Sequence, residues 1–481
     1  MPYPRDARRR AMMTLLAGST ALAGVMAAGL ALASSSAPLG GTPITGALLR
    51  EPQAVTAVDG VTSATLTAKA AVTRIAGRRV VSTVFNGEFP APTLVVRPGD
   101  LLRIADVNQM PTDPTNIHVH GLHVSPSGHG DNVFVNTPAG HTFVNSYRIS
   151  KNQIPGLYWY HPHRHMYADN QVSPGMAGAI VVKGSIDEIP GIRDRRDRVM
   201  VFQRAQVGTD GRVVTPPLDT TKMHTYINGQ LQPVIDIRPG EIQRWRIANA
   251  QGDSFLRLNM GGRTFWTIGT DGNPEPRPVA TDTMLIPPGG RREVLVRGGS
   301  PGTMGLTTLG WGEGPQTVAP AVLATVRSAG IPVTGEQLPG AIYNLPDLRT
   351  QTVAQHRDVT FSFVPLPDGS PQWAINGKMY DDYTSSTNLF QMKLGTTEEW
   401  TLRNTTTEYH PFHIHVNPFQ VVSINGVPQK AIDYRDTVPI PPNGTVVIRQ
   451  RFTDFTGRFV IHCHILFHED HGMMAPIKVV R

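Results

Sequence analysis

Cysteine is almost absent from this chain of 481 residues, whose one thiol belongs to Cys463. A protein with a single cysteine cannot form an internal disulfide, so this thiol is either an inert buried group or a chemically active one. Convincing helical periodicity is also scarce, which disfavours helical folds. Gly (47) and Pro (41) are plentiful instead, and both are typical of many short strands joined by turns.

Long apolar runs are equally scarce, and only residues 11–33 reach the length of a membrane span. This run follows the triplet Arg8 to Arg10, is rich in small residues and ends in Ala31-Leu32-Ala33. These features predict that residues 1–33 are a cleaved signal peptide of twin-arginine type. We therefore expect a periplasmic or secreted protein with no stable membrane insertion after cleavage; a retained membrane anchor is the alternative.

Excess charge of one sign is small once that segment is set aside. The formal charge falls from +7 for the whole chain to +4 for residues 34–481, and the basic residues are not clustered. This composition gives no reason to expect nucleic-acid binding.

The chain repeats itself at the scale of a domain. Asn86-Gly87, Asn228-Gly229 and Asn376-Gly377 each follow a β-branched or aromatic residue and precede an alternating strand-like run, at intervals of 142 and 148 residues. Such a long period predicts three copies of one domain. The short alternating runs bounded by turn residues predict an all-β fold of three Greek-key sandwiches. The expected domains are 50–186, 196–330 and 355–481, joined by linkers at 187–198 and 330–358.

The outer two copies share a feature that the middle copy lacks. Gly156 to His163 and Gly457 to His464 each consist of glycine, four residues with strand preference, and a His-x-His pair. The corresponding stretch of the middle copy, Gly302 to Gly310, has no histidine. The outer domains are therefore expected to carry the chemistry.

Histidines gather in four clusters, and strand geometry explains their spacing. Side chains at i and i+2 of a strand point to the same side, so each His-x-His pair presents two imidazoles to one face. If the outer domains meet, eight imidazoles converge, which suits a cluster of several metal ions. The clusters are His118 and His120; His161 and His163; His410, His413 and His415; and His462, His464 and His468.

Cys463 faces the opposite way from its neighbours His462 and His464. It can therefore join His410, His468 and Met473 in a separate site, where a thiolate, two imidazoles and a weak thioether ligand would form a blue-copper electron-transfer centre. Zinc is the nearest rival metal, but structural zinc sites usually use paired cysteine or Cys/His knuckles that this chain lacks. We interpret the remaining histidines as ordinary surface or core residues; these are His123, His129, His141, His165, His224, His356 and His471.

At these residues the chain resembles the multicopper oxidases, which include laccases, bilirubin oxidases, and cuprous or ferrous oxidases. The family motifs H-x-H-G, H-x-H, H-P-x-H-x-H and H-C-H-x-x-x-H-x-x-x-x-M all match without a gap. The resemblance implies three cupredoxin domains and four copper ions. By position it implies the type 1 copper ligands His410, Cys463, His468 and Met473; the type 2 copper ligands His118 and His413; and the type 3 copper ligands His120, His161, His163, His415, His462 and His464.

The same resemblance implies two acidic residues that deliver protons, Asp131 after the first motif and Glu469 beside the last type 1 histidine. The alternatives are that Asp131 caps a loop and that Glu469 is a solvated surface charge. The implied reaction takes single electrons from a reductant at type 1 copper and reduces dioxygen to two waters at the trinuclear cluster.

The substrate is less well determined. The chain has no long methionine cluster, which favours phenols and aromatic amines over metal ions as reductants. Oxidation of Cu(I), Fe(II) or Mn(II) is the alternative, using surface carboxylates such as Asp381, Asp382 or Asp433. Two functions of other classes are a copper-storage protein and a non-enzymatic envelope scaffold; the complete set of motifs argues against the scaffold.

Overall fold

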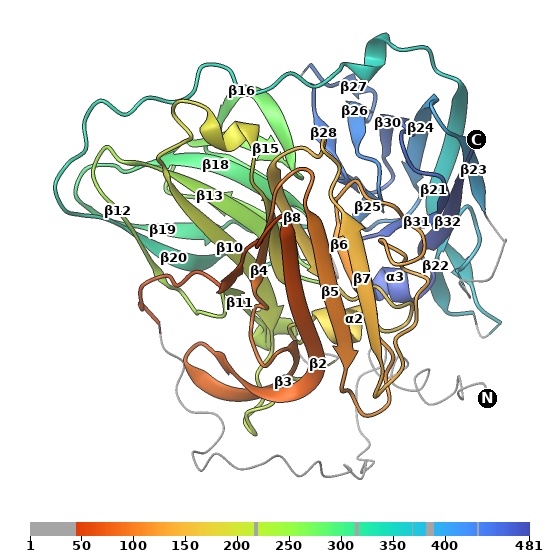
Figure 1. Ribbon diagram of the computed structural model, residues 1–481, viewed down its shortest axis with the longest axis horizontal. Helices are drawn as coiled ribbons and strands as arrows, with labels where there is room; N and C mark the ends of the chain where they lie inside the picture. Colours follow the sequence, from red (N-terminus) through yellow and green to blue (C-terminus); the bar gives the residue numbers. More distant parts are fainter. Residues whose placement is uncertain (1–44, 216–219, 313–316, 368, 381–388, 431) are drawn as a thin grey trace. The chain divides into compact units, whose positions relative to one another are not determined.

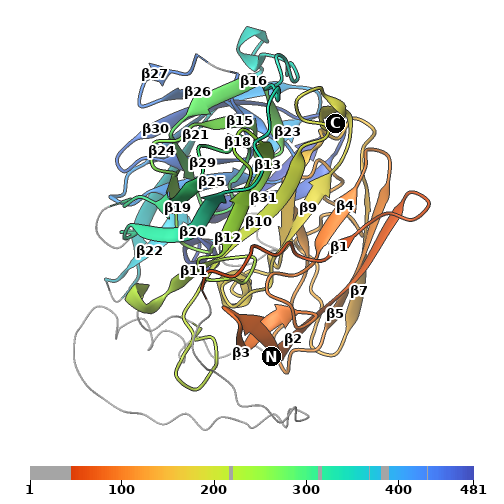
Figure 2. The same ribbon diagram turned by 90° about the vertical axis from the view of Figure 1, so that its left-hand side faces the viewer.

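The computed structural model describes residues 45–215, 220–312, 317–367, 369–380, 389–430 and 432–481. The proposed signal peptide lies outside these residues. The described part is built almost wholly of strands, which follow one another in Figure 1 from orange through green to blue, and Figure 2 shows them from the side. Its sheets form three pairs in chain order, so the prediction of an all-β fold of three sandwiches is confirmed.

The first sandwich packs a five-stranded sheet, in the order β1-β4-β9-β8-β6, with a four-stranded sheet in the order β3-β2-β5-β7. Between them lies a core that includes Leu102, Val119 and Tyr160. Its strands are β1 (Ala54–Val55), β2 (Val61–Ile75), β3 (Arg78–Phe85), β4 (Thr93–Val96), β5 (Leu101–Asn108), β6 (His118–His120), β7 (Thr142–Arg148), β8 (Gly156–His161) and β9 (Gly178–Val182).

The middle sandwich has sheets in the orders β11-β10-β13-β18-β15-β16 and β12-β20-β19-β14-β17, around a core that includes Trp245. Its strands are β10 (Arg196–Ala205), β11 (His224–Ile227), β12 (Val234–Ile237), β13 (Ile242–Asn249), β14 (Leu256–Asn259), β15 (Phe265–Thr270), β16 (Asn273–Thr281), β17 (Thr283–Ile286), β18 (Arg291–Arg297), β19 (Gly302–Thr308) and β20 (Ala321–Ser328).

The third sandwich has one sheet in the order β22-β21-β24-β30-β26-β27, with β28 beside β26, and another in the order β23-β32-β31-β25-β29. Its core includes Trp400 and Cys463. Its strands are β21 (Gln355–Pro365), β22 (Pro371–Ile375), β23 (Phe390–Lys393), β24 (Thr397–Asn404), β25 (His410–Ile414), β26 (Phe419–Ile424), β27 (Val427–Pro428), β28 (Tyr434–Arg435), β29 (Thr437–Ile440), β30 (Thr445–Arg451), β31 (Gly457–Cys463) and β32 (Met474–Val480).

Helical elements within the described residues are short. They are α2 (Ala168–Val172), α3 (Leu466–Asp470), and the 3-10 turns η1 (Ser185–Glu188), η2 (Thr220–Lys222) and η4 (Leu348–Thr350). Helices α2 and α3 contact each other, and the Asp470 carboxylate accepts a hydrogen bond from the backbone N–H of Asp169 at 2.9 Å. This contact links the first sandwich to the third.

The three sandwiches share one topology. In each, the first long strand pairs with a parallel strand further along the chain, as β2 with β5, β10 with β13 and β21 with β24. The Asn-Gly pairs stand at equivalent turns, where Asn86, Asn228 and Asn376 have φ angles of 57°, 51° and 51°. Asparagine and glycine are the residues that adopt this left-handed conformation most readily, which explains the motif.

The first predicted linker, residues 187–198, is anchored to the fold. Strand β10 already begins at Arg196, and the carboxylates of Asp187 and Asp197 both lie 2.8 Å from the buried guanidinium of Arg246 in the middle sandwich. Burial of a charge is costly unless it is paired, so these charged residues are held at the boundary rather than exposed.

Candidate metal centres

Two strand pairs bring the histidine motifs side by side. In the first sandwich β6 pairs with β8 so that His118 is opposite His161, and in the third β25 pairs with β31 so that His413 is opposite His462. Strand β6 includes both histidines of its His-x-His pair, whereas in the other three pairs the second histidine lies just beyond the strand end. These second histidines still point to the same side as the first: the ring centroids of His462 and His464 are 5.5 Å apart. The alternation of side chains therefore holds through the motifs.

The first and third sandwiches meet at these motifs. The imidazole of His118 stacks on that of His415 at 3.9 Å, and that of His120 stacks on that of His413 at 3.8 Å. All eight rings are at most 1% exposed; they belong to His118, His120, His161, His163, His413, His415, His462 and His464. Eight imidazoles converge between the outer sandwiches, as expected from the motif spacing.

Three of these rings outline a metal-sized space. The Nε2 atoms of His163, His415 and His462 lie 3.1, 3.1 and 3.3 Å from one another. The centre of such a triangle is about 1.8 Å from each nitrogen, close to the ~2.0 Å bond that imidazole makes to a first-row transition metal. Nitrogen lone pairs repel at this separation, and a cation between them removes the repulsion.

The imidazoles are neutral and therefore able to act as ligands. Burial, with neighbouring histidines adding to it, lowers the pKa of His118 and of His415 well below its usual value. Burial likewise lowers the pKa of His462 to about 4. A neutral imidazole has one protonated nitrogen and one lone pair, and metal binding requires that lone pair.

The ring nitrogens are divided between protein and centre. The Nδ1 atoms of His118, His161 and His413 lie within hydrogen-bond distance of the Asp131 carboxylate, the Pro162 carbonyl and the Asp436 carbonyl, at 2.9, 2.9 and 2.8 Å. Their Nε2 atoms are buried without a hydrogen-bond partner. Metal-bound histidines are usually held in this way through the second nitrogen, so the residues present fit a metal cluster.

His120 has the opposite orientation. Its Nε2 lies 3.1 Å from Oδ1 of Asp436, and its Nδ1 is the buried nitrogen without a partner. One ring thus presents the other nitrogen to the centre.

A second group of ligands lies in the core of the third sandwich. The Cys463 Sγ atom is 3.6 Å from Nδ1 of His410 and 3.7 Å from Nδ1 of His468, and the two nitrogens are 3.3 Å apart. Burial raises the pKa of the Cys463 thiol well above its usual value, so a thiolate at this place requires a bound cation. Two imidazoles and one thiolate suit copper.

The backbone of Met473 is hydrogen-bonded to two residues of this group, His468 and Cys463. Its backbone N–H donates to the His468 carbonyl at 2.9 Å, and its carbonyl accepts from the Cys463 N–H at 3.0 Å. The Met473 side chain is fully buried in the same core. The backbone of Met473 is thus fixed to Cys463 and His468, and its role as a weak axial ligand stays a prediction.

Both acidic residues named from the motifs lie against the histidine cluster. The carboxylate of Glu469 is fully buried, 3.0 Å from Nδ1 of His462 and 3.4 Å from Nδ1 of His163. Glu469 is therefore no solvated surface charge, and burial raises the pKa of its carboxyl group. Asp131 contacts His118 and also accepts from the Val119 N–H at 3.0 Å; burial raises its pKa to about 8.

Two residues that sequence reasoning missed complete the surroundings of the cluster. Asp436 lies against His120 and His413, and Arg291 of the middle sandwich pairs with it. Burial opposes ionisation of Asp436, but the charge and hydrogen bonds of Arg291 outweigh it and hold its pKa below the usual range. Neither residue belongs to a histidine motif. The only signal in the sequence is that each is a charged residue next to a strand that is expected to be buried.

Two further residues border the cysteine site. The Trp373 ring stacks on that of His468 at 4.6 Å, and a carboxylate oxygen of Glu408 is 3.6 Å from Nε2 of His468. Trp373 Nε1 also donates to Glu408 at 3.4 Å. Both side chains are partly exposed, whereas Cys463 is not.

The remaining candidates are not part of these centres. Among the described residues, none of the seven other histidines belongs to a group of potential metal ligands. Asp433, named above as a surface carboxylate, is instead paired with Arg435 and its side chain is only 15% exposed. Asp381 and Asp382 lie outside the described residues. Among the described residues, no helical segment has the length and hydrophobicity of a membrane span.

Comparisons with known proteins agree with this geometry. Three multicopper oxidase family models match residues 67–186, 200–303 and 347–481. The multicopper oxidase MmcO of Mycobacterium tuberculosis is 27% identical over 448 residues, covering 84% of each chain. A laccase of Bacillus subtilis is 23% identical over 465 residues, covering 82% of this chain and 89% of its own.

The solved structure of a multicopper oxidase from Campylobacter jejuni, described as a metallo-oxidase, is 26% identical with a TM-score of 0.77. The match covers 94% of this chain and 99% of that one. The sandwiches are thus cupredoxin-like domains, and copper is the metal that these buried ligands imply. With family models that together match most of its length, the chain belongs to the multicopper oxidase family.

Proposed function

We propose that this protein is an exported laccase-like oxidase, which takes single electrons from phenols or aromatic amines and reduces dioxygen to water. One observation carries the proposal. Cys463 lies in the His410–His468 site, while the residues on either side of it, His462 and His464, belong to the histidine cluster. Residues 462–464, at the end of strand β31, thus connect the proposed electron-accepting site directly to the proposed trinuclear copper site.

The motifs assign the proposed ligands to four copper ions. Type 1 copper would be held by His410, Cys463, His468 and Met473; type 2 copper by His118 and His413; and the type 3 pair by His120, His161, His163, His415, His462 and His464. The triangle of His163, His415 and His462 supports the assignment of one type 3 ion, and the free Nε2 atoms of His118 and His413 support the type 2 site.

Bound copper would supply one-electron oxidation at the Cys463 site and four-electron reduction of dioxygen at the cluster, in which four protons and four electrons convert one dioxygen to two waters. The protein excludes water from both sites, since every proposed ligand is at most 6% exposed. Glu469 and Asp131 are proposed to supply protons, because their carboxylates lie against cluster histidines and burial favours their protonated forms.

The surroundings of His468 support an aromatic reductant. A phenol or aromatic amine could pack beside Trp373 and donate its O–H or N–H to the Glu408 carboxylate, close to the edge of the His468 ring. The Bacillus subtilis relative is a laccase by name, which is consistent with such a substrate.

Metal-ion oxidation is the second candidate. Glu408 also offers a partly exposed carboxylate to Fe(II), Mn(II) or Cu(I), and the Campylobacter jejuni protein is described as a metallo-oxidase. Replacing Glu408 by Gln removes the charge but keeps the shape. It should raise the KM for a metal ion strongly and that for a phenol only slightly, because only the cation depends on the charge.

The test is a copper-loaded, purified protein, compared with its Cys463→Ser variant. We expect about four copper ions per chain, an intense visible thiolate-to-copper band, and dioxygen uptake with a phenol. The variant should lose the band and the uptake but keep the type 2 electron paramagnetic resonance (EPR) signal. Copper without the visible band would point to storage, and absence of copper to a scaffold.

Export is a separate proposal, supported by Arg8 to Arg10 and the apolar run at residues 11–33. Cell fractionation followed by N-terminal sequencing tests it. Cytoplasmic protein with an intact N-terminus would contradict export, whereas a membrane-bound intact chain would indicate an anchor.

A further inference from the structure

The middle sandwich has none of the proposed copper ligands, yet it contacts the cluster at two points. A Cβ atom on Gly289, in the turn before β18, would lie 2.6 Å from the ring of His464. Two residues later, Arg291 pairs with Asp436. The turn 287–290 and the first residue of β18 therefore form part of the wall around the histidines.

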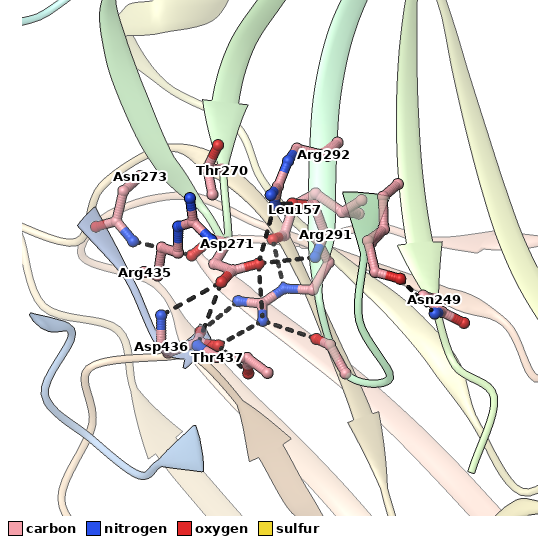
Figure 3. A network of polar contacts seen from close by, with 12 residues as sticks. Leu157, Asn249, Thr270, Asp271, Asn273, Arg291, Arg292, Arg435, Asp436 and Thr437 are labelled. Atoms are coloured by element: carbon pink, nitrogen blue, oxygen red, sulfur yellow. Dashed lines mark hydrogen bonds and ion pairs between the residues drawn. The ribbon is translucent and has the colours of Figure 1, made fainter. Parts of the chain in front are cut away.

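Arg291 is fully buried, and its guanidinium binds the Asp436 carboxylate through two parallel hydrogen bonds (Figure 3). Nη1 donates to Oδ1 at 2.8 Å and Nη2 to Oδ2 at 2.5 Å. The same group donates to the carbonyl of Gly289 at 3.0 Å and, through Nε, to that of Leu157 at 3.4 Å. A planar fork held at all three nitrogens has one orientation, which it imposes on its carboxylate partner.

Asp436 transmits this orientation to the cluster. Its Oδ1 lies 3.1 Å from Nε2 of His120, so that Nδ1 of this ring, and not Nε2, faces the other histidines. Its carbonyl oxygen is 2.8 Å from Nδ1 of His413, so that Nε2 of that ring faces inward. One residue thus sets opposite orientations for two rings that stack at 3.8 Å.

The backbone around this contact is also held by the middle sandwich. The Asp271 carboxylate accepts from the N–H groups of Arg291, Asp436 and Thr437 at 2.8, 3.4 and 3.3 Å. Thr437 in turn donates its hydroxyl to Oδ1 of Asp436 at 2.9 Å. Asp436 therefore cannot turn away from His120 without breaking contacts in two sandwiches.

We propose that Arg291 is a positioning residue of the middle domain. By fixing the Asp436 carboxylate, which lies 3.1 Å from Nε2 of His120 and 3.6 Å from Nδ1 of His413, it holds the stacked rings of one proposed type 3 ligand and one proposed type 2 ligand in place. The inference rests on the copper assignment proposed above. It gives the middle domain a role in the chemistry, although that domain supplies no ligand.

The Arg291→Lys variant tests this role. Lysine keeps the positive charge but cannot make two parallel hydrogen bonds, so Asp436 becomes free to rotate. We expect the visible type 1 band to remain, the type 2 EPR spectrum to change, and kcat to fall about 10- to 100-fold with an unchanged KM for the reductant, the usual effect of losing support for a metal ligand.

Arg246→Lys is the matched control. Arg246 is a fully buried arginine of the neighbouring strand β13, paired with Asp187, Asp197 and Glu293 away from the histidines. Its substitution should lower the melting temperature at least as much while leaving the type 2 spectrum unchanged. Asp436→Asn, which keeps the side-chain shape, is the second test variant, should Arg291→Lys not fold.

Two results would overturn the inference. One is a folded Arg291→Lys or Asp436→Asn protein with wild-type type 2 spectrum and kcat. The other is loss of type 1 and type 2 signals together, in proportion to the loss of folded protein, which would assign Arg291 a purely structural role. A wild-type protein without any type 2 signal would instead contradict the copper assignment itself.

Discussion

At the scale of single residues, lack of space for a side chain explains a motif residue that is not a proposed metal ligand. Gly121, the last residue of the H-x-H-G motif, has φ +86° and lies against the Arg291–Asp436 pair. A Cβ atom there would overlap Nη2 of Arg291 and lie 2.5 Å from Oδ2 of Asp436. The motif therefore ends in glycine because the charged pair occupies the space of a side chain.

Gly121→Ala should consequently disturb both stability and copper content. We expect about 2–4 kcal/mol of destabilisation, from the left-handed backbone and the steric clash together, and a loss of type 2 copper. Thermal unfolding and copper analysis measure the two effects. Gly140→Ala is the control, since Gly140 has φ +77° with nothing within 4 Å and should cost only about 1 kcal/mol. Equal effects of the two substitutions would show that the clash does not matter.

Asp106, a fully buried residue of β5, predicts a pH dependence of stability away from the metal sites. Burial raises its pKa from the usual value of 3.8 to about 7, against a hydrogen bond from Thr137. The folded state thus retains a proton that the unfolded state releases, so this contribution to stability is present below pH 4 and is lost as pH rises towards 7.

Asp106→Asn should remove that loss. The variant should gain about 2–4 kcal/mol relative to wild type between pH 5 and pH 8, since each unit of pKa shift corresponds to about 1.4 kcal/mol. Calorimetric unfolding at the two pH values gives the comparison. A constant difference in stability between variant and wild type across this range would exclude Asp106 as the source.

At the scale of elements, strand β31 and helix α3 connect the two proposed copper sites. The strand places Cys463 in the core of the third sandwich and its neighbours in the cluster, because its side chains alternate. Helix α3 then returns His468 to the cysteine site and leaves Glu469 beside His163 and His462. Consecutive residues thus serve different sites.

Glu469→Gln separates these roles. The amide keeps the shape of the side chain but cannot give up a proton, so reoxidation of the reduced protein by dioxygen should slow by at least about 100-fold. The visible type 1 band and the anaerobic rate of type 1 reduction should stay unchanged, because neither depends on that proton. Stopped-flow absorbance measures both rates; unchanged turnover across pH would reject the proton-donor role.

At the scale of the whole molecule, the cluster acts as a bridge between sandwiches. Its eight imidazoles, the proposed ligands, come in equal numbers from the first and the third sandwich, and buried ring nitrogens such as Nε2 of His161 and His413 have no hydrogen-bond partner. Such groups are costly to bury unless a metal completes their coordination. We therefore expect metal binding to stabilise the contact between the outer sandwiches.

Removal of copper by a chelator should lower the melting temperature by about 5–15 °C, since a ligand that binds only the folded state adds several kcal/mol. Calorimetry before and after chelation, and after copper is restored, measures the effect. A melting temperature independent of copper would mean that protein contacts alone hold the outer sandwiches together.

Much of the architecture was predictable from local patterns. The Asn-Gly period indicated three domains, and alternation within strands indicated the two faces around Cys463, because both depend only on short-range backbone geometry. The motif spacing likewise indicated which histidines gather. Asp433 shows the limit of such reasoning: its charge suggested an exposed side chain, but it is paired with Arg435 and only 15% exposed.

The amino-acid sequence by itself determined the fold class, the family and the set of histidines and cysteine that converge. Only the tertiary structure decided which nitrogen of each ring faces the centre and which residues hold it there. Asp436 and Arg291 are 145 positions apart and belong to different sandwiches. Contacts of that kind depend on how complete domains pack, and a pattern of neighbouring residues carries no information about them.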